Sequence, residues 1–311
     1  MKHYLDEDFF NSMLELKEKD EPGYLAWQVI LCDDTLCPVL RGEKIDIYYR
    51  GFKAFSFTGD GITRNLDDFK NELHTYDIPK VIQKEKFVEY LPYMKQNIDL
   101  WMGAGDKSPY QREFMQLIMR ENNSKEAGNL SDYFIIDMEH QYMKNGSVHD
   151  LTGLIMERGK RQEKIYRLSV IEVKYLDRAF MGPAGIQSDI VDYVKLLNDK
   201  ELLEDYKSDI SEMFCQSKKL GLLPGIRNKC ERICISDERP ELLLTLISRN
   251  TNNDRNNREK EVKSLKALLK SSLDEYGDML DEVYVADTAG IGFGLYVDRK
   301  TGIKAFCEML D

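Results

Sequence analysis

Two charged residues stand close together within a run of otherwise apolar residues. Glu172 and Lys174 alternate with Ile171, Val173 and Tyr175. Because successive side chains of a strand point to opposite faces, a strand here places Glu172 and Lys174 on one face. Burying two such charges is costly unless they pair with each other or hold a metal ion.

A third charged residue opens the preceding predicted strand. Asp150 begins the run 150–156, which an antiparallel hairpin can bring beside Glu172. Two carboxylates with an ammonium group nearby supply the oxygen ligands that Mg²⁺ prefers. The sequence therefore predicts a hard-cation site at Asp150 and Glu172, next to Lys174. The competing interpretation is an exposed pair of Glu172 with Lys174, which contributes about 0–1 kcal/mol.

Histidines offer a second metal hypothesis. His140 and His149 are neighbours of Glu139 and Asp150. Neighbours in a strand face opposite sides of the sheet, so His140 points away if Glu139 faces the site. A histidine-ligated metal is therefore the weaker hypothesis. Cysteines are too scattered for a disulfide framework and lack paired zinc spacing, which favours reduced thiols.

The elements that must position these residues can be read from periodicity. The run of predicted elements is a helix at 110–121, strands at 133–142, 150–156 and 165–175, a helix at 186–197 and a strand at 242–248. This order predicts an α/β core with a mixed sheet. A helix at 259–276 and strands at 282–286 and 292–297 complete it.

The first part of the chain has a different pattern. A predicted amphipathic helix at 4–19 precedes short β-rich runs at 27–32, 43–49 and 52–57, with Arg50-Gly51 as the turn between the last two. The sequence thus predicts an α+β module containing a small antiparallel β-meander. The Gly-containing and Pro-containing segment 103–109 separates it from the rest, giving predicted domains at 1–105 and 106–311.

Asp150 followed by Glu172-Val173-Lys174 resembles the D…(D/E)xK signature of the PD-(D/E)XK nuclease superfamily. The resemblance covers residues 108–248, a little under half of the chain. It implies a restriction-endonuclease-like αβββαβ core with a mixed sheet. Glu139 matches the first strand, where several members carry an additional metal-site acid. Gln187 matches the next helix, where many members keep a glutamine that supports the site.

Two departures from the family pattern stand beside these matches. His149 occupies the position of the eponymous proline, and 22 positions separate Asp150 from Glu172, which requires a long hairpin. The resemblance implies metal ligation by Glu139, Asp150 and Glu172, and a catalytic set of Asp150, Glu172, Lys174 and Gln187.

The implied function is a nuclease that hydrolyses phosphodiester bonds with Mg²⁺ or Mn²⁺. Its partner is a nucleic acid, with DNA favoured over RNA, although the spacing alone does not distinguish them. Anti-phage defence or mobile-element biology is the context that the resemblance suggests. The alternative is a catalytically silent subunit of the same fold that binds nucleic acid or acts as a scaffold within a larger complex.

Composition and charge limit how a nucleic acid could be bound. The 311 residues carry 44 basic and 55 acidic side chains, a net charge of −11, which argues against binding by overall charge. A local basic cluster is the predicted contact surface: Lys218, Lys219, Arg227 and Lys229. The acidic N-terminal segment and the short aliphatic runs predict a cytoplasmic protein with no membrane partner. A homo-oligomer or a partner protein remains open.

Overall fold

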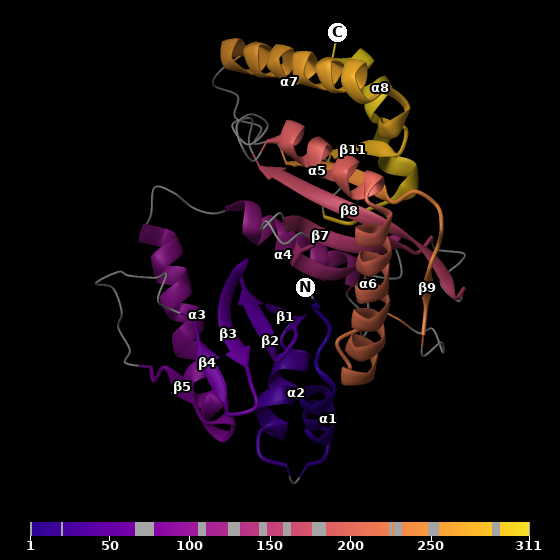
Figure 1. Ribbon diagram of the computed structural model, residues 1–311. Coiled ribbons are helices and arrows are strands. Elements are labelled where there is room, and N and C mark those ends of the chain that lie inside the picture. Colours follow the sequence, from indigo (N-terminus) through magenta and orange to yellow (C-terminus); the bar gives the residue numbers. More distant parts are fainter. Residues whose placement is uncertain are drawn as a thin grey trace. The chain divides into compact units, whose positions relative to one another are not determined.

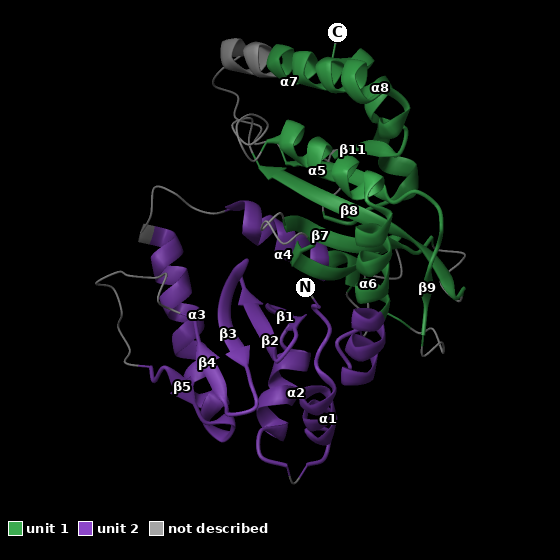
Figure 2. Cartoon of the chain, viewed as in Figure 1, with its two compact units in different colours: residues 1, 121–211, 225–311 green, residues 2–120, 212–224 purple. Residues whose placement is uncertain are grey.

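The computed structural model describes most of the chain in two compact units (Figures 1 and 2). The N-terminal unit comprises residues 2–120 and 212–224, and the C-terminal unit comprises 121–211 and 225–311. The predicted boundary at residue 105 lies outside the described residues. Those residues are 2–19, 21–65, 78–104, 110–123, 131–142, 148–157, 163–175, 185–223, 226, 232–247, 255–287 and 293–310.

The N-terminal unit contains an antiparallel sheet, which confirms the predicted strands at 43–49 and 52–57 but not the one at 27–32. Its strands pair in chain order: β1 (Leu36–Arg41), β2 (Lys44–Tyr49), β3 (Phe52–Phe57), β4 (Ile62–Arg64) and β5 (Val81–Ile82). Its helices are α1 (Glu7–Glu15), α2 (Tyr24–Cys32), η1 (Lys84–Lys86) and α3 (Phe87–Ala104), with residues 110–120 of α4 (Tyr110–Asn123) and 212–220 of α6 (Lys200–Leu220). The ring of Trp27 packs edge-on against Phe57.

The predicted strand at 27–32 is wrong, because these residues form most of α2. Its sequence is apolar at nearly every position, so it has neither the alternation of a half-buried strand nor a clear helical stripe. A short apolar run of this kind fits a buried strand or a buried helix equally well. In the helical form, Trp27 packs against Phe57 of the sheet.

The predicted turn between β2 and β3 is present. Arg50 and Gly51 both have positive φ, 52° and 78°. Positive φ at both central residues matches the twist of a two-residue hairpin turn. Gly51 also lies against the backbone of α4, where a Cβ atom would overlap Arg112. Its N–H donates to the Gln116 side chain at 2.6 Å.

The C-terminal unit contains the mixed sheet predicted from the element order. The strands are β6 (Tyr133–Gln141), β7 (Val148–Ile155), β8 (Ile165–Tyr175), β9 (Cys234–Ile235), β10 (Glu241–Ile247), β11 (Val283–Asp287) and β12 (Thr301–Gly302). They run in the order β12-β11-β10-β8-β7-β6, and β9 pairs with the beginning of β8. β6, β7 and β8 are antiparallel, whereas β8, β10 and β11 are parallel. All of β10 is buried, as expected for a central parallel strand.

Helices flank this sheet on the side of the charged residues of β8. These helices are α5 (Ile186–Asn198) and the first half of α6. The remaining helical elements of the unit are α7 (Arg255–Tyr276), η3 (Gly277–Leu280), η4 (Val297–Arg299) and α8 (Ile303–Met309). Tyr206 of α6 hydrogen-bonds Thr152, whose register partner is Val170. Since Val170 and Glu172 are two positions apart, α6 covers the face that carries Glu172.

The predicted strand at 292–297 is also wrong. Residues 293–296 are irregular, and the 3₁₀ helix η4 begins at Val297. The Asn122 side chain satisfies this segment: its amide donates to the Phe293 carbonyl and its oxygen accepts from the Leu295 N–H, each at 2.9 Å. The Asn122 side chain thus satisfies backbone groups of this segment that a neighbouring strand would otherwise bond.

Candidate active site

Asp150 and Glu172 lie together where β7 and β8 separate. The paired register of these strands ends at Leu151 and Ile171. One residue beyond it, the Asp150 Oδ2 accepts a hydrogen bond from the Val173 N–H at 2.9 Å. The Asp150 and Glu172 carboxyl groups are close enough that each shifts the pKa of the other. Two ionised carboxyl groups this close repel each other, so the site favours a proton or a cation between them.

Lys174 lies beside this pair and is held by an acid from α5. Its Nζ is 2.8 Å and 3.0 Å from the two carboxylate oxygens of Asp189, and 4.0 Å from Glu172 Oε2. Only 3% of Lys174 is exposed. Burial alone would lower its pKa, but the carboxylates of Asp189, Glu172 and Asp150 raise it above its usual value. Lys174 is therefore a permanent cation at neutral pH.

The cluster carries more acid than one ammonium can balance. Burial raises the pKa of Glu172 far above its usual value, and the charges of Asp150 and Asp189 raise it further. Burial also raises the pKa of Asp150 and brings that of Asp189 to about 7. Three carboxyl groups face the single positive charge of Lys174. Protons or a cation must supply the remaining balance.

Glu139 lies at the edge of the cluster. Its charge raises the pKa of Asp150, so it acts on the pair electrostatically. Glu139 has a positive φ of 58°, and the pairing of β6 shifts between Ile135 and Asp137. Within the described part of the chain, Glu139, Asp150 and Glu172 do not bring three ligand atoms within 4.8 Å of one another. The sequence predicted that Glu139, Asp150 and Glu172 would meet at one metal ion. In the structure Asp150 and Glu172 form a close pair, and Glu139 lies outside it.

Gln187 does not occupy the position expected of it. Gln187 is exposed in the first turn of α5, after the N-cap Gly185, and the contact with Lys174 comes from Asp189 instead. At 100° per residue, two positions along a helix are about 200° apart, so these side chains leave opposite sides. Sequence reasoning missed Asp189, although an acid in the first turn after the strand of Lys174 was a usable signal.

His149 also belongs to this cluster, although the sequence predicted no role for it in the site. Its Nδ1 lies 2.8 Å from Glu172 Oε1, and its ring stacks on Tyr142 with centroids 3.9 Å apart. The Nε2 atom is buried and has no hydrogen-bond partner among the described residues. Burial, with a smaller effect from the charge of His140, lowers the pKa of His149 well below its usual value. His149 is therefore neutral beside Glu172.

The strand-alternation rule failed here for a local reason. His149 and Asp150 lie beyond Leu151, the last β7 residue in register with β8. Past that pair the two strands are no longer held in a common pleat, so both residues can reach Glu172. His140 instead lies 2.6 Å from Asp137 and 3.4 Å from Asp209.

The predicted basic surface is only partly described. Lys218 and Lys219 end α6 and belong to the N-terminal unit, whereas Arg227 and Lys229 lie outside the described residues. The Lys219 ammonium is 6.0 Å from the centre of the Phe10 ring. A role for these four residues in binding nucleic acid stays a prediction.

No protein-family model matches the chain, and neither the curated proteins nor the solved structures contain a significant match. Within the described helices, none combines the length and apolar character needed to cross a membrane.

Proposed function

We propose that the chain is a metal-dependent nuclease whose active centre is Asp150, Glu172 and Lys174, with Asp189 as a positioning residue. One observation carries the proposal: the buried Glu172 and the half-buried Asp150 lie together, with Lys174 4.0 Å from Glu172, and their surroundings raise the pKa of both carboxyl groups while Lys174 stays charged. Strongly perturbed pKa values from burial plus specific partners are typical of functional sites.

A divalent cation fits the chemistry of this pair. Asp150 and Glu172 supply hard oxygen ligands, and a bound cation would relieve the repulsion between their two carboxylates. When bound, Mg²⁺ or Mn²⁺ would polarise a phosphodiester and acidify a bound water. The His149 ring lies 2.8 Å from Glu172 Oε1, which fixes the orientation of that carboxyl group.

Lys174 then acts as a charged ammonium group that stabilises negative charge near the metal site. Because its pKa is raised, Lys174 holds its proton at neutral pH and cannot serve as the general base. Its N–H groups can orient an attacking water or a non-bridging phosphate oxygen, where negative charge develops. Asp189 keeps the ammonium in place at 2.8 Å. DNA is the proposed substrate, and a role in defence or in mobile elements is part of the same hypothesis.

Cleavage assays on plasmid DNA, single-stranded DNA and RNA, with Mg²⁺ or Mn²⁺ or EDTA, test this function. We expect divalent-dependent cleavage that is lost in Asp150→Asn and Lys174→Ala. Asp192→Asn is the matched control, since Asp192 lies on α5 but pairs with the half-exposed Lys195. Circular dichroism verifies that each variant is folded.

Calorimetric titration with Mn²⁺ separates the two classes of function. Binding to the wild type that Asp150→Asn abolishes, together with cleavage, supports an active nuclease. Mn²⁺ binding or DNA binding without cleavage of any substrate would favour the silent subunit. A protein that neither binds Mn²⁺ nor cleaves contradicts the proposal.

A further inference from the structure

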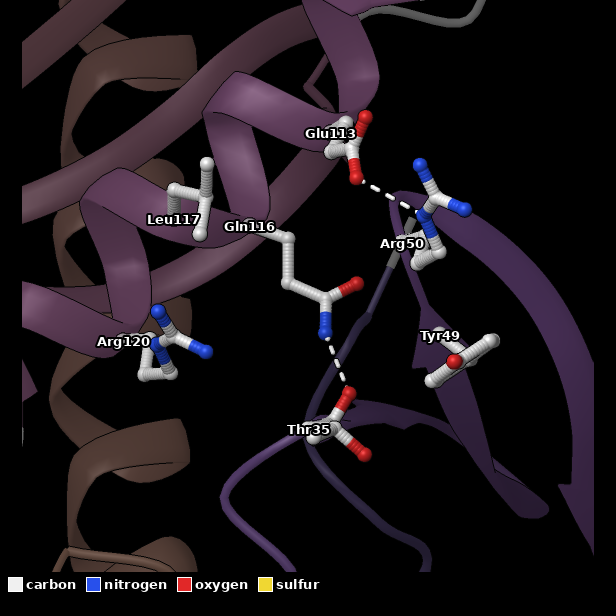
Figure 3. A pocket seen from close by; sticks show the side chains of 7 residues that line it. All are labelled: Thr35, Tyr49, Arg50, Glu113, Gln116, Leu117 and Arg120. Atoms are coloured by element: carbon white, nitrogen blue, oxygen red, sulfur yellow. Dashed lines mark hydrogen bonds and ion pairs between the residues drawn. The ribbon is translucent and has the colours of Figure 1, made fainter. Parts of the chain in front are cut away.

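A pocket of about 130 Å³ lies in the N-terminal unit, in a part of the chain that has no role in the proposed nuclease site (Figure 3). It is formed by the residue before β1, the β2–β3 turn and one side of α4. Its polar lining residues are Thr35, Tyr49, Arg50, Glu113, Gln116 and Arg120.

The inner wall of this pocket is held by hydrogen bonds. The Gln116 side chain accepts from the Gly51 N–H at 2.6 Å and donates to the Thr35 carbonyl at 2.7 Å. Arg50 donates from Nε to Glu113 at 2.8 Å and from Nη1 to Asp99 at 2.9 Å. These contacts fix the wall of the pocket, and a wall held by its own hydrogen bonds lowers the entropic cost of binding.

Arg120 differs from its neighbours in having no counter-charge. In the described residues it makes no ion pair and no hydrogen bond, although it borders the pocket and is exposed. Figure 3 shows its guanidinium directed towards Gln116 and Thr35. Arg50 is matched by the carboxylates of Glu113 and Asp99, so the positive charge available to a ligand in this pocket is that of Arg120.

We propose that this pocket binds a phosphate group, with Arg120 as the principal charged donor. A guanidinium presents several N–H groups in a planar fork that suits the oxygens of a phosphate. A water molecule occupies about 30 Å³ of liquid, so the pocket has room for an oxyanion larger than water. The phosphate can belong to a free nucleotide or to the backbone of a nucleic acid. The proposal does not depend on the nuclease proposal, because it uses none of the same residues.

Titrations with inorganic phosphate, pyrophosphate and a short thymidine oligonucleotide test this site in the full-length protein. We expect saturable binding of at least one probe that weakens about tenfold or more in Arg120→Gln, since charge-assisted hydrogen bonds are lost. Arg120→Lys should lie between, because it keeps the charge but not the fork. The matched control is Arg112→Gln, an exposed arginine of α4 that does not line the pocket, and it should bind like the wild type.

The probes also identify the source of the phosphate. Binding of phosphate or pyrophosphate indicates a free anion or nucleotide, whereas binding of the oligonucleotide alone indicates a nucleic-acid backbone. The proposal is overturned if no probe binds at millimolar concentration. It is equally overturned if Arg120→Gln binds as tightly as the wild type, or if Arg112→Gln weakens binding as much.

Discussion

Removing the charge of Asp189 is expected to change how the stability of the metal-free protein depends on pH. Burial raises the pKa of Asp189 from 3.8 to about 7, against the attraction of Lys174. A carboxyl group whose pKa is raised by folding is ionised less readily in the folded protein. Its contribution to stability is therefore complete below its unfolded pKa and is lost as the pH rises through about 7.

The size of this loss of stability follows from the difference between the unfolded and folded pKa values of Asp189. About three pH units separate the two pKa values, and each unit corresponds to about 1.4 kcal/mol, which gives a loss of up to about 4 kcal/mol. In Asp189→Asn this group no longer ionises, so the loss disappears. Lys174 then keeps the carboxylates of Glu172 and Asp150 as its partners.

Urea unfolding followed by circular dichroism, in EDTA and between about pH 4 and pH 8, measures this effect. The unfolding free energy of Asp189→Asn should rise relative to the wild type across that range, by up to about 4 kcal/mol. Asp192→Asn, three positions along α5, removes only the smallest contribution to that raised pKa, so its curve should stay close to that of the wild type. If the curve of Asp189→Asn also stays close to that of the wild type, the buried acid excess is not real and the reasoning fails. Mg²⁺ should flatten the wild-type curve by supplying positive charge.

Two substitutions that do not involve this cluster are expected to lower stability by known mechanisms. Gly51→Ala places a side chain against the backbone of α4 at a positive φ, so we expect a loss of about 2 kcal/mol or more, whereas Gly59→Ala, which has open space, should be nearly neutral. Tyr133→Phe removes a 2.6 Å hydrogen bond to buried Glu241 and should cost about 1–3 kcal/mol. Tyr284→Phe, at a half-buried site, should cost less. Equal losses within either pair of variants, measured by thermal unfolding, would contradict the packing and hydrogen bonding described here.

Some of this architecture could be read from local patterns alone. Alternation along β8 predicted that Glu172 and Lys174 share a face, and a hairpin between β7 and β8 predicted Asp150 as their neighbour; the structure brings these three residues together. The mixed sheet and the N-terminal antiparallel sheet also followed from element order. These features depend on the period of a strand and on short connections, which neighbouring residues determine.

Other features depend on contacts between distant segments. Which of Gln187 and Asp189 meets Lys174 depends on how α5 is rotated about its axis against the sheet. The pairing of β7 with β8 stops at Leu151, so His149, two residues before it, is free of that register and reaches Glu172.

Tertiary packing also decided the state of ambiguous segments and the second candidate site. The apolar run of α2 fits either kind of buried element until Trp27 has a partner to pack against. The pocket at Arg120 joins residues from three elements whose separation in the chain leaves no local signal. The sequence by itself determined which residues could share a strand face. Only the fold decided which helix face, strand end and turn complete each site, because those choices are set by packing between segments far apart in the chain.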